Sequence, residues 1–142
     1  MPIKAIIIDD ERLARNELKK LLEQYPDITI IDEASNVDEG VEKIDLSRPD
    51  LIFLDIQMPG KTGFDLLAEI EKSPRVIFTT AYDEFALKAF EVNALDYLLK
   101  PIDPKRLTDA IQKLQSEITL EQASLLGVNR GPLTEVDQVF VK

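Results

Sequence analysis

Five polar side chains in this sequence stand at the end of an apolar, strand-forming run or just after it: Asp9, Asp10, Asp55, Thr80 and Lys100. Three carboxylates brought together repel, because two like charges about 4 Å apart cost about 4 kcal/mol at an effective dielectric constant of about 20. Mg²⁺ relieves such repulsion and uses one or two carboxylates, waters and a phosphate oxygen. Asp55 can then act as a nucleophile toward phosphorus while Thr80 and Lys100 hold the phosphoryl oxygens. The residue types predict magnesium-dependent phosphoryl transfer.

Each of these residues also has an ordinary structural role. The pair Asp9-Asp10 is more often a helix start than a metal site, Asp55 can cap a loop, and Lys100 can be a solvated cation. Thr80 alone carries no signal. What favours function is the combination, because all five occur at the carboxyl ends of predicted strands, where open parallel sheets bind their ligands.

Strands and helices alternate five times along the chain. Apolar runs predict strands at 3–8, 28–34, 51–55, 75–79 and 94–99, and apolar residues at helical spacing predict helices at 12–25, 37–46, 64–70, 83–92 and 103–118. This alternation predicts an α/β fold, a doubly wound five-stranded parallel sheet with right-handed connections. Counting elements leaves two common strand orders open, and five strands fit the flavodoxin-like order 2-1-3-4-5. In that order the first and third strands are neighbours, so their acids meet.

Composition narrows the possible functions. The 142 residues are 44% hydrophobic, which suits one compact domain, and the absence of cysteine and histidine excludes thiolate and imidazole nucleophiles and most zinc sites. The formal charge of -10 makes this chain a poor binder of nucleic acid, whose affinity rests on Lys and Arg. By itself, that acidity indicates solubility more than cation binding. No apolar run is long enough for a membrane span, and we expect a cytoplasmic protein.

The pattern weakens toward the C-terminus. We expect the folded domain to occupy residues 1–118, followed by a linker or helix extension at 119–134 that contains glycine and proline. Residues 135–142 end in an alternating apolar pattern, typical of the first strand of a further domain. A disordered tail is the alternative for that last segment.

Four short motifs resemble the signature of the receiver domains of two-component response regulators. They occur in the expected order between residues 3 and 118: Ile8-Asp9-Asp10-Glu11, Leu54-Asp55-Ile56-Gln57-Met58-Pro59-Gly60, Thr79-Thr80-Ala81 and Asp96-Tyr97-Leu98-Leu99-Lys100-Pro101. The resemblance implies the receiver (CheY-like) form of the flavodoxin-like fold. It also implies a phosphoacceptor that takes its phosphoryl group from a sensor histidine kinase or a small acyl phosphate.

The resemblance assigns roles around the third strand. Asp55 would be the phosphoacceptor, and Asp10 and Asp55 would bind Mg²⁺ directly together with the backbone carbonyl of Gln57. Asp9 would act mostly through a bound water. The peptide bond before Pro101 would be cis.

The resemblance also assigns roles around the phosphoryl group. Thr80 and Lys100 would hold the phosphoryl oxygens. On phosphorylation, Thr80 would move toward the phosphoryl group and Tyr97 would turn inward. The local alternative for Tyr97 is an amphipathic strand residue with a solvated hydroxyl.

In the family, the face built from the fourth helix, fifth strand and fifth helix pairs two receivers. Here Lys88, Asp96 and Arg106 would match charges across a homodimer. Residues 81–90 and 94–101 are similar to receivers of LytTR-type (LytR/AlgR-like) regulators, whose C-terminal domain binds DNA. The resemblance therefore implies transcription regulation, with DNA bound only by a domain absent from this chain.

Two other functions remain as alternatives. A phosphatase or phosphotransferase with an aspartyl-phosphate intermediate would resemble the haloacid-dehalogenase-like enzymes, which place a second acid two residues after the nucleophile. That position is Gln57 here, which disfavours turnover of an external substrate and favours an acceptor that gains and loses its own phosphoryl group. A pure interaction module is the second alternative, and the complete set of five groups argues against it.

Overall fold

A five-stranded sheet forms the centre of the computed structural model, which describes residues 2–125. Its strands are β1 (Ile3–Ile8), β2 (Ile28–Ala34), β3 (Leu51–Asp55), β4 (Arg75–Thr80) and β5 (Asp96–Leu99). They pair in parallel in the order β2-β1-β3-β4-β5. This confirms the predicted flavodoxin-like order and makes β1 and β3 neighbours.

The first four helices connect successive strands, and the fifth follows the last strand. They are α1 (Arg12–Leu22), α2 (Val37–Ser47), α3 (Gly63–Glu69), α4 (Ala86–Glu91) and α5 (Pro104–Leu125). The chain divides into two compact units, residues 1–110 and residues 111–142. The sheet and all residues predicted to form the site belong to the first unit. Within residues 2–125, no helix is both long enough and apolar enough to cross a bilayer.

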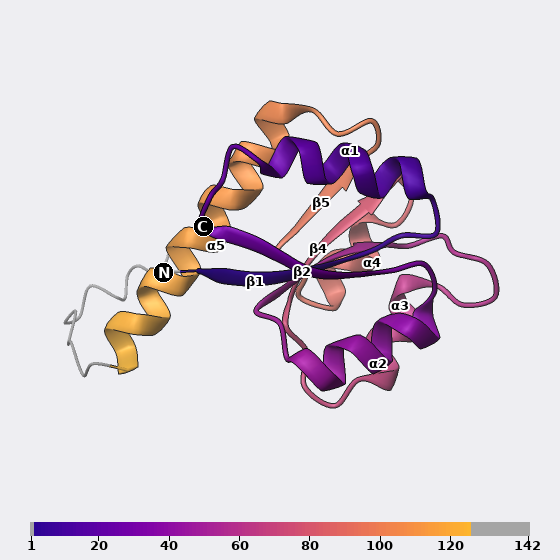
Figure 1. The fold of residues 1–142 in the computed structure, drawn as a ribbon, viewed down its shortest axis with the longest axis horizontal. Coiled ribbons are helices and arrows are strands. Elements are labelled where there is room, and N and C mark those ends of the chain that lie inside the picture. The colour runs from indigo at the N-terminus through magenta and orange to yellow at the C-terminus, as the bar shows by residue number, and fades with distance from the viewer. Residues whose placement is uncertain (1, 126–142) are drawn as a thin grey trace. The chain divides into compact units, whose positions relative to one another are not determined.

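The sheet is buried on both faces because its central strands are continuous apolar runs. In Figure 1, α1 lies on one side of the sheet and α2 and α3 lie on the other. Leu18 and Leu22 of α1 are buried, as are Leu107 and Ala110 at the start of α5. The main buried cluster joins the sheet to α2, α3 and α4: Ile6, Ile8, Ala34, Val37, Ile44, Ile52, Leu54, Ile56, Met58, Leu66, Ile70, Val76, Phe78 and Ala89.

Side-chain caps fix the starts of three helices. Asn36 accepts a hydrogen bond from the Glu39 amide at the start of α2, and Asp103 accepts one from the Lys105 amide at the start of α5. At α3 a capping box joins Thr62 and Asp65 in both directions. The loop between β3 and α3 therefore ends at a defined point close to Asp55.

Strand β2 contains an irregularity opposite β1. Ala5 pairs with Ile30 while Ile6 pairs with Asp32, so Ile31 is an extra residue in β2. An extra residue of this kind bends a strand and changes the direction of the side chains that follow it. Glu33 comes directly after Asp32 and so follows this irregularity.

The fourth helix and the fifth strand are shorter than predicted. Helix α4 begins at Ala86 rather than residue 83, and the amide of Phe85, just before it, donates to the Tyr97 hydroxyl. It ends at Glu91; two residues later Asn93 has a left-handed φ of 61°, and the Ala94 amide then donates to the Ala89 carbonyl. Strand β5 consequently starts at residue 96 instead of 94.

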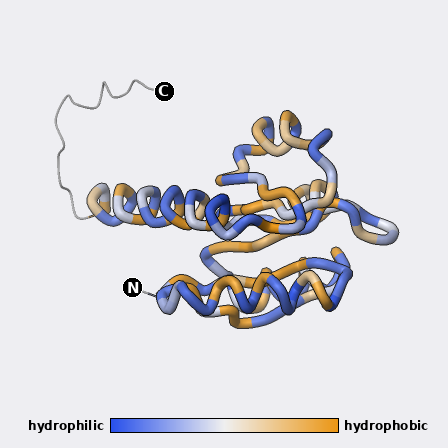
Figure 2. Tube along the Cα trace, turned by 90° about the horizontal axis from the view of Figure 1, so that it is seen from above, coloured by the Kyte–Doolittle hydropathy of each residue, from blue (hydrophilic) through white to orange (hydrophobic). Residues whose placement is uncertain are grey.

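Two apolar residues at helical spacing, one in α1 and one in α4, lie on the surface. The side chains of Leu13 and Phe90 are 70% and 78% exposed. Figure 2 shows apolar and polar stretches alternating along the helices, which is the pattern that suggested burial. The alternation shows that one helix face is apolar, but it does not show which residues of that face the rest of the fold covers.

Helix α5 extends to Leu125, so the predicted linker at 119–134 begins as a helix extension. The prediction of a strand at 135–142 concerns residues outside those that the structure describes.

Candidate functional site

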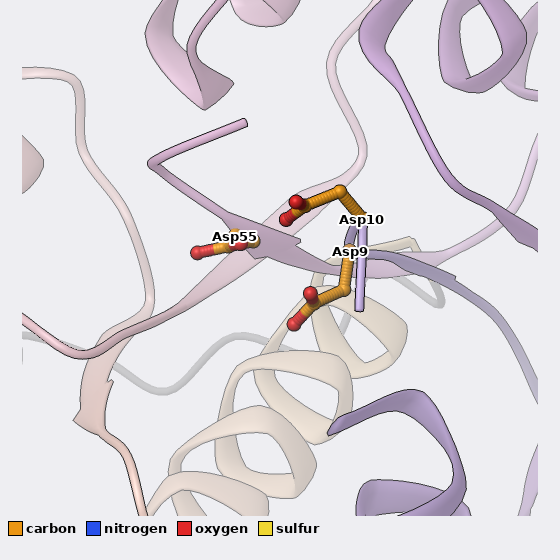
Figure 3. A group of neighbouring side chains, drawn as sticks. All are labelled: Asp9, Asp10 and Asp55. Carbon is orange, nitrogen blue, oxygen red and sulfur yellow. The ribbon is translucent and has the colours of Figure 1, made fainter. Parts of the chain in front are cut away.

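The three predicted acids meet at the carboxyl edge of the sheet. Ile8 pairs with Leu54 across β1 and β3, so the next residues, Asp9 and Asp55, lie at adjacent strand ends. One ligand oxygen from each of Asp9, Asp10 and Asp55 lies within 4.8 Å of the other two (Figure 3). Asp9 and Asp55 are buried, at 3% and 4% exposure, whereas Asp10 is exposed. The neighbouring strand ends thus deliver a compact acidic cluster.

Lys100 supplies the positive charge of the cluster. It follows β5, and its ammonium lies 2.7 Å from Asp9 Oδ2, 3.6 Å from Asp55 Oδ2 and 3.8 Å from Glu11 Oε1. Burial alone lowers the pKa of Lys100, but the Asp9 hydrogen bond and the neighbouring negative charges outweigh it, so the pKa is raised. The amine is therefore a fixed cation. The peptide bond between Lys100 and Pro101 is cis.

Asp55 has an unusual protonation equilibrium for a carboxylic acid. Burial and repulsion from Asp9 and Asp10 together raise the pKa of Asp55 from 3.8 to about 7, with the Lys100 charge opposing them. A cation placed among the acids would favour the ionised form. The site can therefore present Asp55 as a carboxylate nucleophile when a cation compensates the cluster.

Thr80 occupies the end of β4, and its side chain is fully buried. Its backbone carbonyl accepts a hydrogen bond of 2.7 Å from the Lys100 amide, which ties the ends of β4 and β5 together. Its hydroxyl accepts a hydrogen bond of 3.3 Å from the Tyr82 amide. The hydroxyl is thus held by the loop that follows β4.

The Tyr97 hydroxyl also binds that loop. It donates to the Tyr82 carbonyl and accepts a hydrogen bond of 3.3 Å from the Phe85 amide. The backbone of Tyr82 is consequently held from both ends, by Thr80 through its amide and by Tyr97 through its carbonyl. This network links the strand end that carries Thr80 to the middle of β5.

The donor set of the cluster fits Mg²⁺. Three carboxylates with converging oxygens, one of them exposed, provide the oxygen ligands that this ion prefers while leaving room for waters and a phosphate oxygen. Gln57 lies two residues after Asp55 in the loop toward α3, and its side chain is exposed.

The three residues predicted for a dimer face are engaged within the chain. Arg106 forms an ion pair of 2.9 Å with Asp96, whose side chain is largely buried. The Lys88 ammonium lies 4.7 Å from the centre of the Phe64 ring. To pair charges across a homodimer, Lys88, Asp96 and Arg106 would have to give up these contacts within the chain.

Two features near the acids were not found from the sequence. Arg15 of α1 donates a hydrogen bond of 2.7 Å to the Asp9 backbone carbonyl and one of 2.9 Å to Glu33. In addition, a pocket of about 990 Å³ beside Asp9 and Lys100 runs along α1 and is lined by the exposed Leu13. An arginine five residues after the paired acids is the only sequence signal for the first feature.

Comparison with known proteins shows the family to which the chain belongs. Residues 5–112 match the family model of the response regulator receiver domain. The chain is 45% identical to the transcriptional regulatory protein BtsR of Escherichia coli K12, covering 92% of this chain and 56% of BtsR. It is also 45% identical to the sensory transduction protein LytT of Bacillus cereus, covering 81% of this chain and 48% of LytT.

Among solved structures, the REC domain of the response regulator AraT from Geobacillus stearothermophilus superposes with a TM-score of 0.77 at 32% identity. The match covers 86% of this chain and 99% of that domain. The chain spans about half the length of BtsR and LytT. It carries the receiver domain of a two-component response regulator, and it therefore belongs to the response-regulator receiver family.

Proposed function

We propose that Asp55 is the phosphoacceptor of this receiver domain and that Asp9, Asp10 and Asp55, with the Gln57 carbonyl, hold the Mg²⁺ that phosphorylation needs. The observation that carries the proposal is the convergence of the three acids within 4.8 Å, with Lys100 3.6 Å from Asp55. When bound, the ion supplies positive charge at the phosphoryl oxygens.

In the proposed reaction, an Asp55 carboxylate oxygen attacks the phosphorus of a phosphohistidine or acyl phosphate. The new P–O bond forms as the bond to the donor nitrogen or oxygen breaks, and the leaving group keeps that electron pair. Lys100 stabilises charge on the phosphoryl oxygens. To do so it would leave its 2.7 Å contact with Asp9, whose charge a bound cation would then compensate.

Intact-mass measurement after incubation with Mg²⁺ and acetyl phosphate tests this proposal. We expect a gain of one phosphoryl group in the wild type and none in Asp55→Asn. Continuous release of phosphate would instead support a turnover enzyme, and no gain in mass would support an interaction module. Omitting Mg²⁺ should abolish the gain in the wild type.

We further propose that a phosphorylated protein donor docks over the pocket along α1. Asp55 is only 4% exposed, so a donor must approach closely, and the pocket joins Asp9 and Lys100 to the apolar surface of Leu13 and Leu21. Leu13→Asp should slow transfer from an autophosphorylated sensor kinase and leave labelling by acetyl phosphate unchanged. Equal slowing with both donors would contradict docking there.

The output side of the proposal rests on the relatives. BtsR is named a transcriptional regulatory protein, and this chain matches only 56% of its length. We propose that phosphorylation of Asp55 controls a DNA-binding part of the whole protein through Thr80 and Tyr97. In Tyr97→Phe, phosphorylation should proceed while the phosphorylation-dependent gain in DNA affinity of the whole protein is lost.

We also propose that phosphorylation favours a homodimer through α4, β5 and the first turns of α5. Leu87 and Phe90 of α4 are 70% and 78% exposed, and Leu99 of β5 is 46% exposed. Exposed apolar residues on adjacent elements are typical of an interaction surface.

A further inference from the structure

Arg15 makes a contact that the phosphorylation chemistry does not require by itself. Its guanidinium is largely buried, with 15% of the side chain exposed, and it uses two different nitrogens. Nη1 donates to the Asp9 carbonyl at 2.7 Å, and Nε donates to Glu33 Oε1 at 2.9 Å. Since the guanidinium is planar and rigid, the Glu33 bond fixes the direction of the Asp9 bond.

The extra residue in β2 precedes the partner of this arginine. Glu33 follows the shift in register between β1 and β2, and its side chain meets α1. Lys19, one turn further along α1, binds the other carboxylate oxygen at 2.6 Å. The pKa of Glu33 is lowered mainly by Lys19, with burial opposing and Arg15 adding to the effect. Glu33 is therefore a stable anion that holds the guanidinium in place.

The Asp9 carbonyl belongs to the peptide that joins the two acids of the cluster. The other polar groups of Asp9 are already engaged: its amide donates to Ala34, and its carboxylate accepts from the Glu11 amide and binds Lys100. The hydrogen bond from Arg15 completes this set and fixes the plane of the peptide between Asp9 and Asp10. Together with the φ angle of Asp10, that plane sets the direction in which the Asp10 side chain leaves the backbone.

We infer that Arg15, held by Glu33, is a positioning residue that orients the Asp9–Asp10 peptide for Mg²⁺ binding. The inference rests on the proposed metal site. It concerns a residue that touches neither the ion nor the phosphoryl group in the proposed arrangement. Partners of this outer kind typically change metal affinity about 10- to 100-fold when they are removed.

Lys19 provides a matched control. It carries the same charge on the same helix and binds the same Glu33 carboxylate, but its hydrogen bond leads to Glu33 and not to Asp9. Replacing either residue by methionine removes one positive charge and one contact with Glu33. Only the Arg15 substitution frees the Asp9 carbonyl.

The test is the dissociation constant of Mg²⁺, measured by isothermal titration calorimetry on protein stripped of metal with EDTA. We expect Arg15→Met to weaken binding about tenfold and Lys19→Met to weaken it less than about twofold. Arg15→Lys should remain substantially weakened, because one ammonium lacks the planar fork that serves both acceptors. Equal weakening in Arg15→Met and Lys19→Met, or full recovery in Arg15→Lys, would show a charge effect and overturn the inference.

Circular dichroism and urea unfolding of each variant separate folding from binding. If Arg15→Met does not fold, the Mg²⁺ affinities of Arg15→Lys and Lys19→Met are compared instead. An Arg15→Lys variant that binds Mg²⁺ as tightly as the wild type would overturn the inference. A wild type that binds no Mg²⁺ would instead remove the proposed metal site itself. If the wild type and Arg15→Met bind Mg²⁺ equally well, the metal site stands and only the role of Arg15 is refuted.

Discussion

Asp55, the candidate acceptor, is a carboxyl group whose ionised form is disfavoured in the metal-free protein. Its pKa is raised from 3.8 to about 7, first by burial and then by Asp9. Between these two values the folded state binds more protons at this group than the unfolded state does. Its contribution to stability is therefore complete below about pH 4 and is lost as the pH rises through 7.

In metal-free protein, this predicts a particular difference between the wild type and Asp55→Asn. The wild type should lose stability relative to the variant between about pH 5.5 and about pH 8, since only the wild type must ionise a buried carboxyl there. Urea unfolding at the two pH values in EDTA measures the difference. A constant difference between the two proteins would contradict a raised pKa for Asp55, and added Mg²⁺ should reduce the wild-type loss.

Tyr82 is predicted to protect the phosphorylated acceptor. It lies two residues after Thr80, is half-exposed and meets Phe85 edge-on at 6.4 Å. If its bulk obstructs the attacking water, Tyr82→Ala should dephosphorylate about fivefold faster, which corresponds to about 1 kcal/mol of barrier. Loss of phosphate followed by intact mass checks this, with Tyr82→Phe as the control that keeps the ring. Slower decay in Tyr82→Ala than in the wild type would refute the prediction.

At the scale of elements, the start of α3 is packed directly against the end of β3. The Gly63 amide donates to the Ile56 carbonyl at 2.9 Å, and a Cβ at position 63 would lie 2.6 Å from the Asp55 carbonyl oxygen. Glycine therefore allows the helix to approach the strand that carries the acceptor. The approach sets the position of the Asp55 backbone.

Gly63→Ala should displace that backbone. We expect a loss of about 1–3 kcal/mol in the free energy of unfolding, as for other insertions of a methyl group into a packed site, together with slower phosphorylation. Gly60→Asn is the control in the same loop: Gly60 has a φ of 86°, a Cβ there meets nothing within 4 Å, and Asn tolerates left-handed backbone. Unfolding in urea and labelling by acetyl phosphate measure both effects. Equal stability of Gly63→Ala and wild type would contradict the role of this contact.

The arrangement of elements followed from the sequence because it depends on local patterns. Apolar runs such as 51–54 are long and continuous, and their acids could be placed together once β1 and β3 were made neighbours. Local patterns could not place Arg15 of α1 against Glu33 of β2, because the two residues are far apart in the sequence and Glu33 follows an irregularity in its strand. The exposure of Leu13 was missed for a related reason. Helical spacing shows which residues share a face, but not how much of that face the sheet covers.

At the scale of the whole molecule, the face around α4 predicts a change in assembly on phosphorylation. Acetyl phosphate and Mg²⁺ should convert the wild type from monomer to dimer in sedimentation velocity, and Phe90→Asp should stay monomeric because it places a charge on an apolar contact. Leu46→Asp is the control, because Leu46 of α2 is 80% exposed but lies on another helix. Phosphorylated wild type that remains monomeric would defeat the proposal.

The ammonium of Lys100 spans Asp9 and Asp55 in the protein as it folds. A built-in counter-ion of this kind means that the newly made chain does not have to capture a metal before its acids can be packed together. Folding and readiness to signal are thus separate events. If the proposed site holds Mg²⁺, the supply of magnesium would govern how promptly Asp55 is phosphorylated, while the fold itself would form without the ion.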